Sequence, residues 1–176
     1  MKNIVLLGFM GTGKSAVGRR LATEFHYQFV DTDQMVEEKA HQRISEIFEK
    51  RGEEAFRRLE SEVVVGLAER TGCVISTGGG IVLNPKNLDL LSMNGTLVLL
   101  QSRPEVIFKR VQKRAGQRPL LGGPDPLSAI TRLLSEREPL YRRAEFTLDT
   151  SDMKIEEVVQ TVKRKVLEIE GRKSSS

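Results

Sequence analysis

Short apolar runs alternate with amphipathic stretches along this chain. Runs of consecutive apolar residues form most of the stretches NIVLLG at 3–8, CVIS at 73–76 and TLVLL at 96–100, and polar or turn-forming residues bound each run. Two further strands are predicted at residues 27–33 and 145–149. Continuous apolar strands are typical of a parallel sheet that is buried on both faces. The pattern therefore predicts an α/β protein, with a five-stranded parallel sheet flanked by helices in a three-layer fold.

Helical periodicity fills the segments between these strands, because apolar residues recur there every three or four positions. Arg51 and Gly52 separate two of the predicted helices, and the Gly- and Pro-rich stretch 115–126 is irregular. No internal repeat or linker is present, so we expect one domain over residues 1–170 and a flexible tail over 171–176. The predicted helices cover residues 15–25, 34–50, 53–70, 85–93, 104–114, 127–141 and 154–170.

The composition is that of an ordinary globular protein, with 39% apolar and 30% charged residues among 176 positions. The net charge is +4 and the isoelectric point is near 9.3. Acidic and basic residues are interleaved, which indicates a solvated surface rather than a basic patch. The aromatic content of 5% also offers few platforms for stacked bases. We therefore expect no nucleic-acid partner.

No apolar run approaches the ~20 residues that a membrane-spanning helix requires. The N-terminal stretch runs into a glycine-rich loop without a small-residue cleavage site, so no signal peptide is predicted. These features lead us to expect no membrane partner and a cytoplasmic location. Cys73 is the single cysteine and is expected to be a small buried hydrophobe rather than a nucleophile.

The stretch GFMGTGKS at residues 8–15 matches the pattern of a phosphate-binding loop, and it lies between a predicted strand and a predicted helix. Its glycines let backbone amides point at a β-phosphate, and the helix N-terminus adds further N–H groups. Lys14 is expected to reach the β and γ oxygens, and Ser15 to bind Mg²⁺. A purely structural glycine turn is the alternative. The predicted ATP-binding residues here are Gly11, Thr12, Gly13, Lys14, Ser15 and Ala16.

Asp31 and Asp33 close the second predicted strand in the stretch DTD. Two residues apart on extended backbone, their carboxylates face the same way. Asp31 suits a position near Mg²⁺, whereas Asp33 could hold or deprotonate an attacking alcohol. The alternative interpretation is structural, with Asp33 as a helix N-cap and Asp31 in a solvated loop.

Three consecutive glycines, Gly78, Gly79 and Gly80, follow the third predicted strand. This is more glycine than one turn requires, and it would let a ligand lie directly on the backbone, although a structural loop is the alternative. Arg57 and Glu60 lie three residues apart on one helix face. Glu60 can orient the guanidinium of Arg57 toward a planar anion, although exposed pairs of this kind are common.

Taken in order, the stretches GFMGTGKS, DTD, FRRLE, STGGG, RPLL and EREPLYRRA resemble the shikimate kinase family over residues 3–165. The resemblance implies transfer of the γ-phosphate of ATP to the 3-hydroxyl of shikimate, in the chorismate pathway to aromatic amino acids. It also implies the fold of the nucleoside monophosphate kinases. A substrate-binding helical region would cover about residues 33–60, and a lid would cover about residues 112–124.

The same resemblance implies roles for individual residues. Asp33 would contact the shikimate hydroxyls, as a base or as a positioning group, and Asp31 would lie near one Mg²⁺ per subunit. Arg57 and Arg137 would grip the shikimate carboxylate, with Gly78, Gly79 and Gly80 lining that site. The resemblance also implies a monomer.

Two arginines are assigned to the nucleotide by the resemblance. Arg118, in RPLL, would swing with the lid onto the phosphates and would act in catalysis together with Lys14 and Asp33. Arg110 would stack on the adenine, with Arg114 as an alternative for that role.

Other functions are compatible with parts of the sequence. A gluconate kinase shares the phosphate loop, but the combination of DTD, FR and GGG favours shikimate. A nucleoside monophosphate kinase is a more distant alternative. A non-catalytic nucleotide-binding module or a nucleic-acid binder is disfavoured by the presence of Lys14, Asp33 and Arg118.

Overall fold

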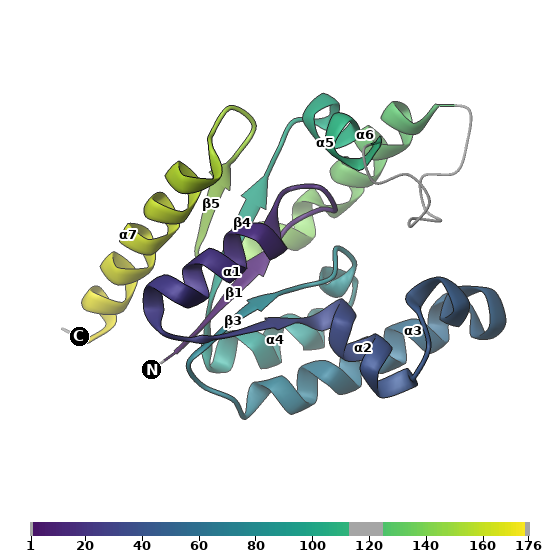
Figure 1. Ribbon diagram of the computed structural model, residues 1–176, viewed down its shortest axis with the longest axis horizontal. Coiled ribbons are helices and arrows are strands. Elements are labelled where there is room, and N and C mark those ends of the chain that lie inside the picture. The colour runs from purple at the N-terminus through teal and green to yellow at the C-terminus, as the bar shows by residue number, and fades with distance from the viewer. Residues whose placement is uncertain (1, 113–124, 175–176) are drawn as a thin grey trace.

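The computed structural model describes residues 2–112 and 125–174 (Figure 1). Its five parallel strands form one sheet in the order β2-β3-β1-β4-β5, so the predicted α/β fold with a five-stranded parallel sheet is confirmed. Every strand of the sheet is followed by a helix, which is the connection that parallel neighbours require. The strands are β1 (Asn3–Leu7), β2 (Gln28–Asp31), β3 (Cys73–Ser76), β4 (Gly95–Gln101) and β5 (Phe146–Asp149).

Helices cover both faces of this sheet. Two short 3₁₀ helices, η1 (Ile81–Leu83) and η3 (Glu138–Arg143), lie in the connections. Among the described residues, no helix is long and apolar enough to cross a membrane. The α-helices are α1 (Lys14–Phe25), α2 (Thr32–Ala40), α3 (Ile44–Ala68), α4 (Pro85–Met93), α5 (Pro104–Gln112), α6 (Pro126–Arg137) and α7 (Ile155–Ser174).

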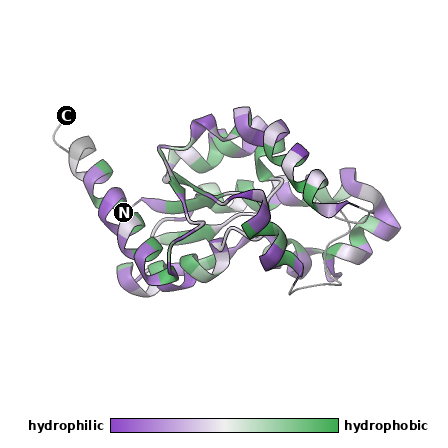
Figure 2. Ribbon diagram, turned by 90° about the horizontal axis from the view of Figure 1, so that it is seen from above, coloured by the Kyte–Doolittle hydropathy of each residue, from purple (hydrophilic) through white to green (hydrophobic). Residues whose placement is uncertain are grey.

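Alternate side chains of β1 point into two different cores. Val5 and Leu7 pack with residues of α2, α3 and α4 on one face. Ile4 and Leu6 pack with α1 and α7 on the other face, and all four side chains are 0% exposed. The strands are mostly hydrophobic in Figure 2, whereas the helices alternate between hydrophobic and hydrophilic stretches along their length. Burial on both faces explains why β1 reads as an unbroken apolar run.

The predicted helix over residues 34–50 is wrong, because the chain forms two helices there. Helix α2 ends at Ala40, and His41 takes a left-handed conformation with φ of 51°. Helix α3 then begins at Ile44, where Glu46 accepts a hydrogen bond from the Arg43 N–H at 3.0 Å. The break predicted at Arg51 and Gly52 is a kink within α3, where Gly52 has φ of 78°.

The predicted helix over residues 127–141 is shorter than expected. Helix α6 ends at Arg137, and η3 continues from Glu138. Pro139 accounts for the change, because it lacks the N–H that an α-helix would need at that position. Ending the helix here places Arg137 at its last turn, beside the carboxyl ends of the strands.

Candidate functional site

A cleft of about 920 Å³ opens at the carboxyl ends of the central strands. Ligands of open parallel sheets bind at this edge. All the predicted site residues that the structure describes line this one cleft: Gly11, Thr12, Gly13, Lys14, Ser15, Ala16, Asp31, Asp33, Arg57, Gly78, Gly79, Gly80, Arg110 and Arg137. Of the lid predicted over about residues 112–124, the part from 113 onward lies outside the described residues, and so do Arg114 and Arg118.

The cleft has two parts. We call residues 8–16 the loop side, since they form the loop after β1 and the first residues of α1 in one continuous stretch. We call Asp33, Arg57, Glu60 and Arg137, together with the turn Gly78–Gly80, the turn side. The two sides meet where Gly79 approaches the loop, because a Cβ at Gly79 would lie 3.3 Å from the Met10 nitrogen.

Backbone conformation shapes the loop side. Gly11 and Gly13 have φ of 77° and 94°, which residues with a Cβ rarely adopt. Lys14 begins α1, yet its Nζ turns back and donates to the carbonyl oxygens of Gly8 and Phe9 at 2.8 and 2.9 Å. The loop therefore wraps around the ammonium group of Lys14, which is only 8% exposed. Such a loop, at a helix N-terminus, is suited to binding an anion.

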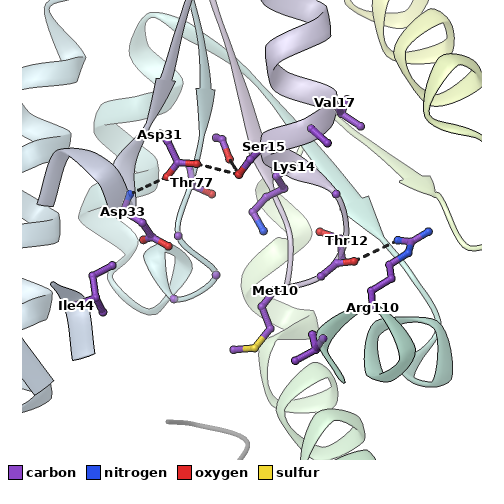
Figure 3. Close-up of a pocket in the computed structure, with 18 of the residues that line it drawn as sticks. Met10, Thr12, Lys14, Ser15, Val17, Asp31, Asp33, Ile44, Thr77 and Arg110 are labelled. Atoms are coloured by element: carbon purple, nitrogen blue, oxygen red, sulfur yellow. Dashed lines mark hydrogen bonds between the residues drawn. The ribbon is translucent and has the colours of Figure 1, made fainter. Parts of the chain in front are cut away.

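Asp31 connects β2 to the loop side. Its Oδ2 accepts a hydrogen bond from Ser15 Oγ at 2.9 Å, and its Oδ1 accepts one from the Asp33 N–H at 3.1 Å (Figure 3). Asp31, rather than Asp33, is thus the N-cap of α2. The strand predicted over residues 27–33 ends at Asp31, and Asp33 already lies in the helix, so the two carboxylates are not related by extended backbone.

Ser15 and Asp31 offer an alcohol oxygen and a carboxylate oxygen side by side, which are donors that Mg²⁺ accepts. Among the described residues, no group of three or more His, Cys, Asp or Glu is placed to hold a metal. A sparse donor set agrees with Mg²⁺, which usually keeps waters and phosphate oxygens as its other ligands. The residues present therefore fit the predicted ion.

Ser76 is a site residue that the sequence analysis missed. It ends β3, is 1% exposed, and its Oγ lies 3.1 Å from Ser15 Oγ. Its position at the end of the strand, two residues before the glycine triplet, was the available signal, because strand ends carry the ligands in this type of sheet.

The glycines of the turn side make room for protein side chains. A Cβ at Gly78 would collide with Asp33 Oδ1 and would lie 3.0 Å from Glu60 Oε1. A Cβ at Gly80 would overlap the guanidinium of Arg57, with its Cζ 2.6 Å away. The Gly78 N–H also donates to Thr32 Oγ1 at 2.8 Å, which ties the turn to α2.

Arg57 reaches the turn from α3 between two acidic residues. Its Nη1 donates to Glu60 Oε2 at 2.9 Å, as the spacing in the sequence predicted. Its Nη2 donates to Glu53 at 3.1 Å. The Glu60 side chain is only 2% exposed, compared with 53% for that of Glu53. Burial raises the pKa of Glu60 to about 7, with a smaller upward contribution from Asp33, although Arg57 and Arg137 oppose the shift.

Arg137 comes to the same turn from the end of α6. Its Nη1 donates to the Gly79 carbonyl at 2.9 Å, and its Cζ lies 5.1 Å from the centre of the Phe9 ring. It is 5% exposed, which is unusual for an arginine. The two guanidinium groups of Arg57 and Arg137 therefore flank the glycine turn from different helices.

Arg110 lies at the other end of the cleft, beyond Thr12 (Figure 3). Its Nη1 donates to the Gly11 carbonyl at 3.2 Å and to Ser102 Oγ at 3.1 Å, and its Nη2 donates to the Thr150 carbonyl at 3.3 Å. Ser102 and Thr150, which the sequence analysis missed, are hydrogen-bonded to each other at 2.8 Å. Arg110 therefore links the loop side to the ends of β4 and β5.

Known proteins match this chain over most of its length. A family model described as shikimate kinase matches residues 10–167. A shikimate kinase from Caldanaerobacter subterraneus subsp. tengcongensis is 51% identical over 172 residues, covering 98% of this chain and 100% of that protein. The solved structure of a shikimate kinase from Acinetobacter baumannii, in complex with shikimate, has a TM-score of 0.90 and 36% identity. That match covers 96% of this chain and 94% of the other.

A gluconokinase from Sinorhizobium meliloti is also similar in structure, with a TM-score of 0.55 at 19% identity. The match covers 90% of this chain and 87% of that chain, and at this identity it indicates a shared fold alone.

Proposed function

Because this chain belongs to the shikimate kinase family, we propose a role in phosphoryl transfer for each group of residues in its cleft. The protein is an ATP-dependent kinase that phosphorylates shikimate, and a gluconate-type kinase is not favoured. The reaction moves the γ-phosphate of ATP to the 3-hydroxyl. A bond forms between the hydroxyl oxygen and the γ-phosphorus, the bond from that phosphorus to ADP breaks, and the hydroxyl loses its proton.

The loop side binds the phosphates of ATP in this proposal. Backbone amides of residues 11–16 surround the β-phosphate, and Lys14 exchanges its carbonyl partners for β and γ oxygens. Ser15 and Asp31 would hold one Mg²⁺, which would neutralise phosphate charge when bound. Ser76 keeps the Ser15 hydroxyl oriented, while Arg110 anchors the loop beside the adenine.

The turn side binds the acceptor. A small acid with one carboxylate and several hydroxyls requires a cationic clamp at one end and a polar acceptor at the other. Arg57 and Arg137 supply the clamp on either side of the glycine turn. Asp33, at the start of α2 and close to Asp31, accepts the hydrogen bond of the reacting hydroxyl and can receive its proton.

One observation carries this assignment. Two buried or half-buried arginines and an aspartate from three separate helices meet at a single glycine turn, next to a phosphate-binding loop. An anion clamp beside a hydroxyl acceptor is the arrangement that an alcohol kinase with an acidic substrate requires.

An assay of ADP formation in the presence of ATP and Mg²⁺ tests the acceptor. Parallel reactions contain shikimate, gluconate, AMP or no acceptor. Stimulation by shikimate alone is the expected result. Arg57→Ala should then raise the KM for shikimate roughly 10- to 100-fold and change kcat less, because a hydrogen bond to a charged group is worth about 1.5–3 kcal/mol. An unchanged KM would overturn the clamp assignment.

The remaining features of the proposal rest on the family resemblance. We propose that the protein works as a cytoplasmic monomer and that residues 1–170 form one kinase domain. Sedimentation of the purified protein with and without substrates tests the monomer.

A further inference from the structure

Glu60 is a buried acid within the turn side. It is 1% exposed in the folded protein, so a charge on it would be almost fully removed from water. Its Oε2 accepts the hydrogen bond from Arg57. Its Oε1 is buried and has no hydrogen-bond partner among the described residues. A charged carboxylate would be costly in this position, and protonation lowers that cost.

The groups that face Glu60 come from three helices. Arg57 lies on its own helix, Asp33 on α2, and Arg137 at the end of α6. Glu60 Oε1 and Asp33 Oδ1 lie against the same point of the backbone, because a Cβ at Gly78 would meet both. Two carboxylates so close disfavour simultaneous ionisation, and this adds to the effect of burial in raising the pKa of Glu60 to about 7.

Arg57 already has a second acidic partner. Glu53 accepts hydrogen bonds from its Nε at 3.3 Å and from its Nη2 at 3.1 Å. With both glutamates ionised, the guanidinium would be shared between two anions before any substrate arrived. A substrate carboxylate would then add a third negative charge around one arginine. Protonation of Glu60 removes one of these three negative charges and leaves Arg57 able to attract the carboxylate of the substrate.

We propose that Glu60 takes up a proton from solvent when the carboxylate of the acceptor docks on Arg57, so that acceptor binding is linked to proton binding. This inference rests on the proposed clamp of Arg57 and Arg137. The linkage is reciprocal: acceptor binding favours the protonated glutamate, and alkaline pH, which ionises it, weakens acceptor binding.

Calorimetric titration of shikimate into the protein without nucleotide measures this uptake directly. Repeating the titration at about pH 8, in two buffers with different ionisation enthalpies, gives the number of protons bound. We expect roughly 0.5–1 proton per site in the unmodified protein. The KM for shikimate should also rise roughly fivefold or more between about pH 6 and about pH 9.

Two variants localise the proton. Glu60→Gln keeps the shape and a hydrogen-bond acceptor for Arg57, and it should show almost no uptake and a KM that is nearly independent of pH. Glu53→Gln removes an exposed charge from the same guanidinium, and it should retain both effects. Circular dichroism establishes that each variant is folded.

Three outcomes are informative. An unmodified protein that binds shikimate without proton uptake overturns the inference, even if Glu60→Gln does not fold. Uptake that persists in a folded Glu60→Gln variant also overturns it, because the proton then binds elsewhere. If Arg57→Ala has an unchanged KM, it is the clamp that fails, and this result is independent of the proton count.

Discussion

The loop side of the cleft comes from one continuous stretch, residues 8–16, whereas the turn side takes side chains from α2, α3 and α6. The loop side presents mainly backbone groups, held in place by left-handed glycines and by the ammonium group of Lys14. The turn side presents carboxylates and guanidinium groups around a turn that lacks Cβ atoms. One side therefore depends on local conformation, and the other on the packing of distant segments.

The comparison predicts that a change on the loop side affects the chemical step more than it affects acceptor binding. Lys14→Ala should lower kcat by about 10³-fold, because the proposed mechanism assigns to Lys14 the charge that stabilises the phosphoryl group in the transition state. The KM for shikimate should change by less than about threefold. Lys109→Ala, an exposed lysine on α5, is the matched control in the same steady-state assay. A large rise in KM for shikimate would contradict the division of the cleft.

The buried acid of the turn side should also affect stability. The pKa of Glu60 is raised from 4.5 to about 7 in the folded protein, so the native state binds more protons than the unfolded state between these values. The free energy of unfolding should therefore fall as the pH rises through this window and level off above it. At about 1.4 kcal/mol per pH unit, the contribution of Glu60 is at most roughly 3 kcal/mol.

Urea unfolding at about pH 5 and about pH 8 measures that contribution as the difference between the unmodified protein and Glu60→Gln. The variant should lose less stability on going to the higher pH, whereas Glu53→Gln should follow the unmodified protein. If all three proteins lose the same stability between the two pH values, Glu60 is ionised at both of them, and its pKa is not raised in the folded protein.

A smaller effect is expected from filling the turn. Gly80 has φ of –99°, which alanine tolerates, so Gly80→Ala should not strain the backbone. The added Cβ would instead displace the guanidinium of Arg57. We expect the KM for shikimate to rise about tenfold, and the KM for ATP and the stability to change little. Similar increases in both KM values would mean that the two sides are not separable.

The smallest effect should come from a glycine outside the cleft. Gly66 lies within α3, is exposed, and has no atom within 4 Å of an added Cβ. Gly66→Ala should raise the free energy of unfolding by about 0.5–1 kcal/mol, since alanine is a better helix former, and should leave both KM values unchanged. Thermal unfolding measures the gain in stability. If Gly66→Ala also weakened acceptor binding, the effect of Gly80→Ala could not be assigned to the specific contact of Gly80 with Arg57.

The sheet and the loop side could be predicted from the sequence because their signals are local. An apolar run predicts β1, and the spacing of glycines and lysine in residues 8–15 predicts the loop after it. The Arg57–Glu60 ion pair was also predicted, since it depends only on helical spacing. Each of these features is contained within a few neighbouring residues.

The turn side was predicted less completely, because its geometry depends on tertiary contacts. The glycines were expected to admit a ligand, but Gly78 and Gly80 directly adjoin Asp33 and Arg57. The contact of Ser76 with Ser15 joins residues far apart in the sequence, and the burial of Glu60 Oε1 depends on the packing of distant segments. The helix boundary at His41 was missed because a left-handed residue other than glycine leaves no clear pattern.

The position of β1 also has a consequence for hydrogen exchange. β1 pairs with both β3 and β4, and Ile4, Val5, Leu6 and Leu7 are fully buried. The amides of this strand should therefore exchange with deuterium only when the whole protein opens. The loop that follows begins at the next residue, Gly8, and must let nucleotide enter and leave. We therefore expect the slowest-exchanging amides of the protein, in β1, to be adjacent in the chain to some of the faster-exchanging ones, in the loop. The strand that opens most rarely thus anchors the segment that must respond to each catalytic cycle.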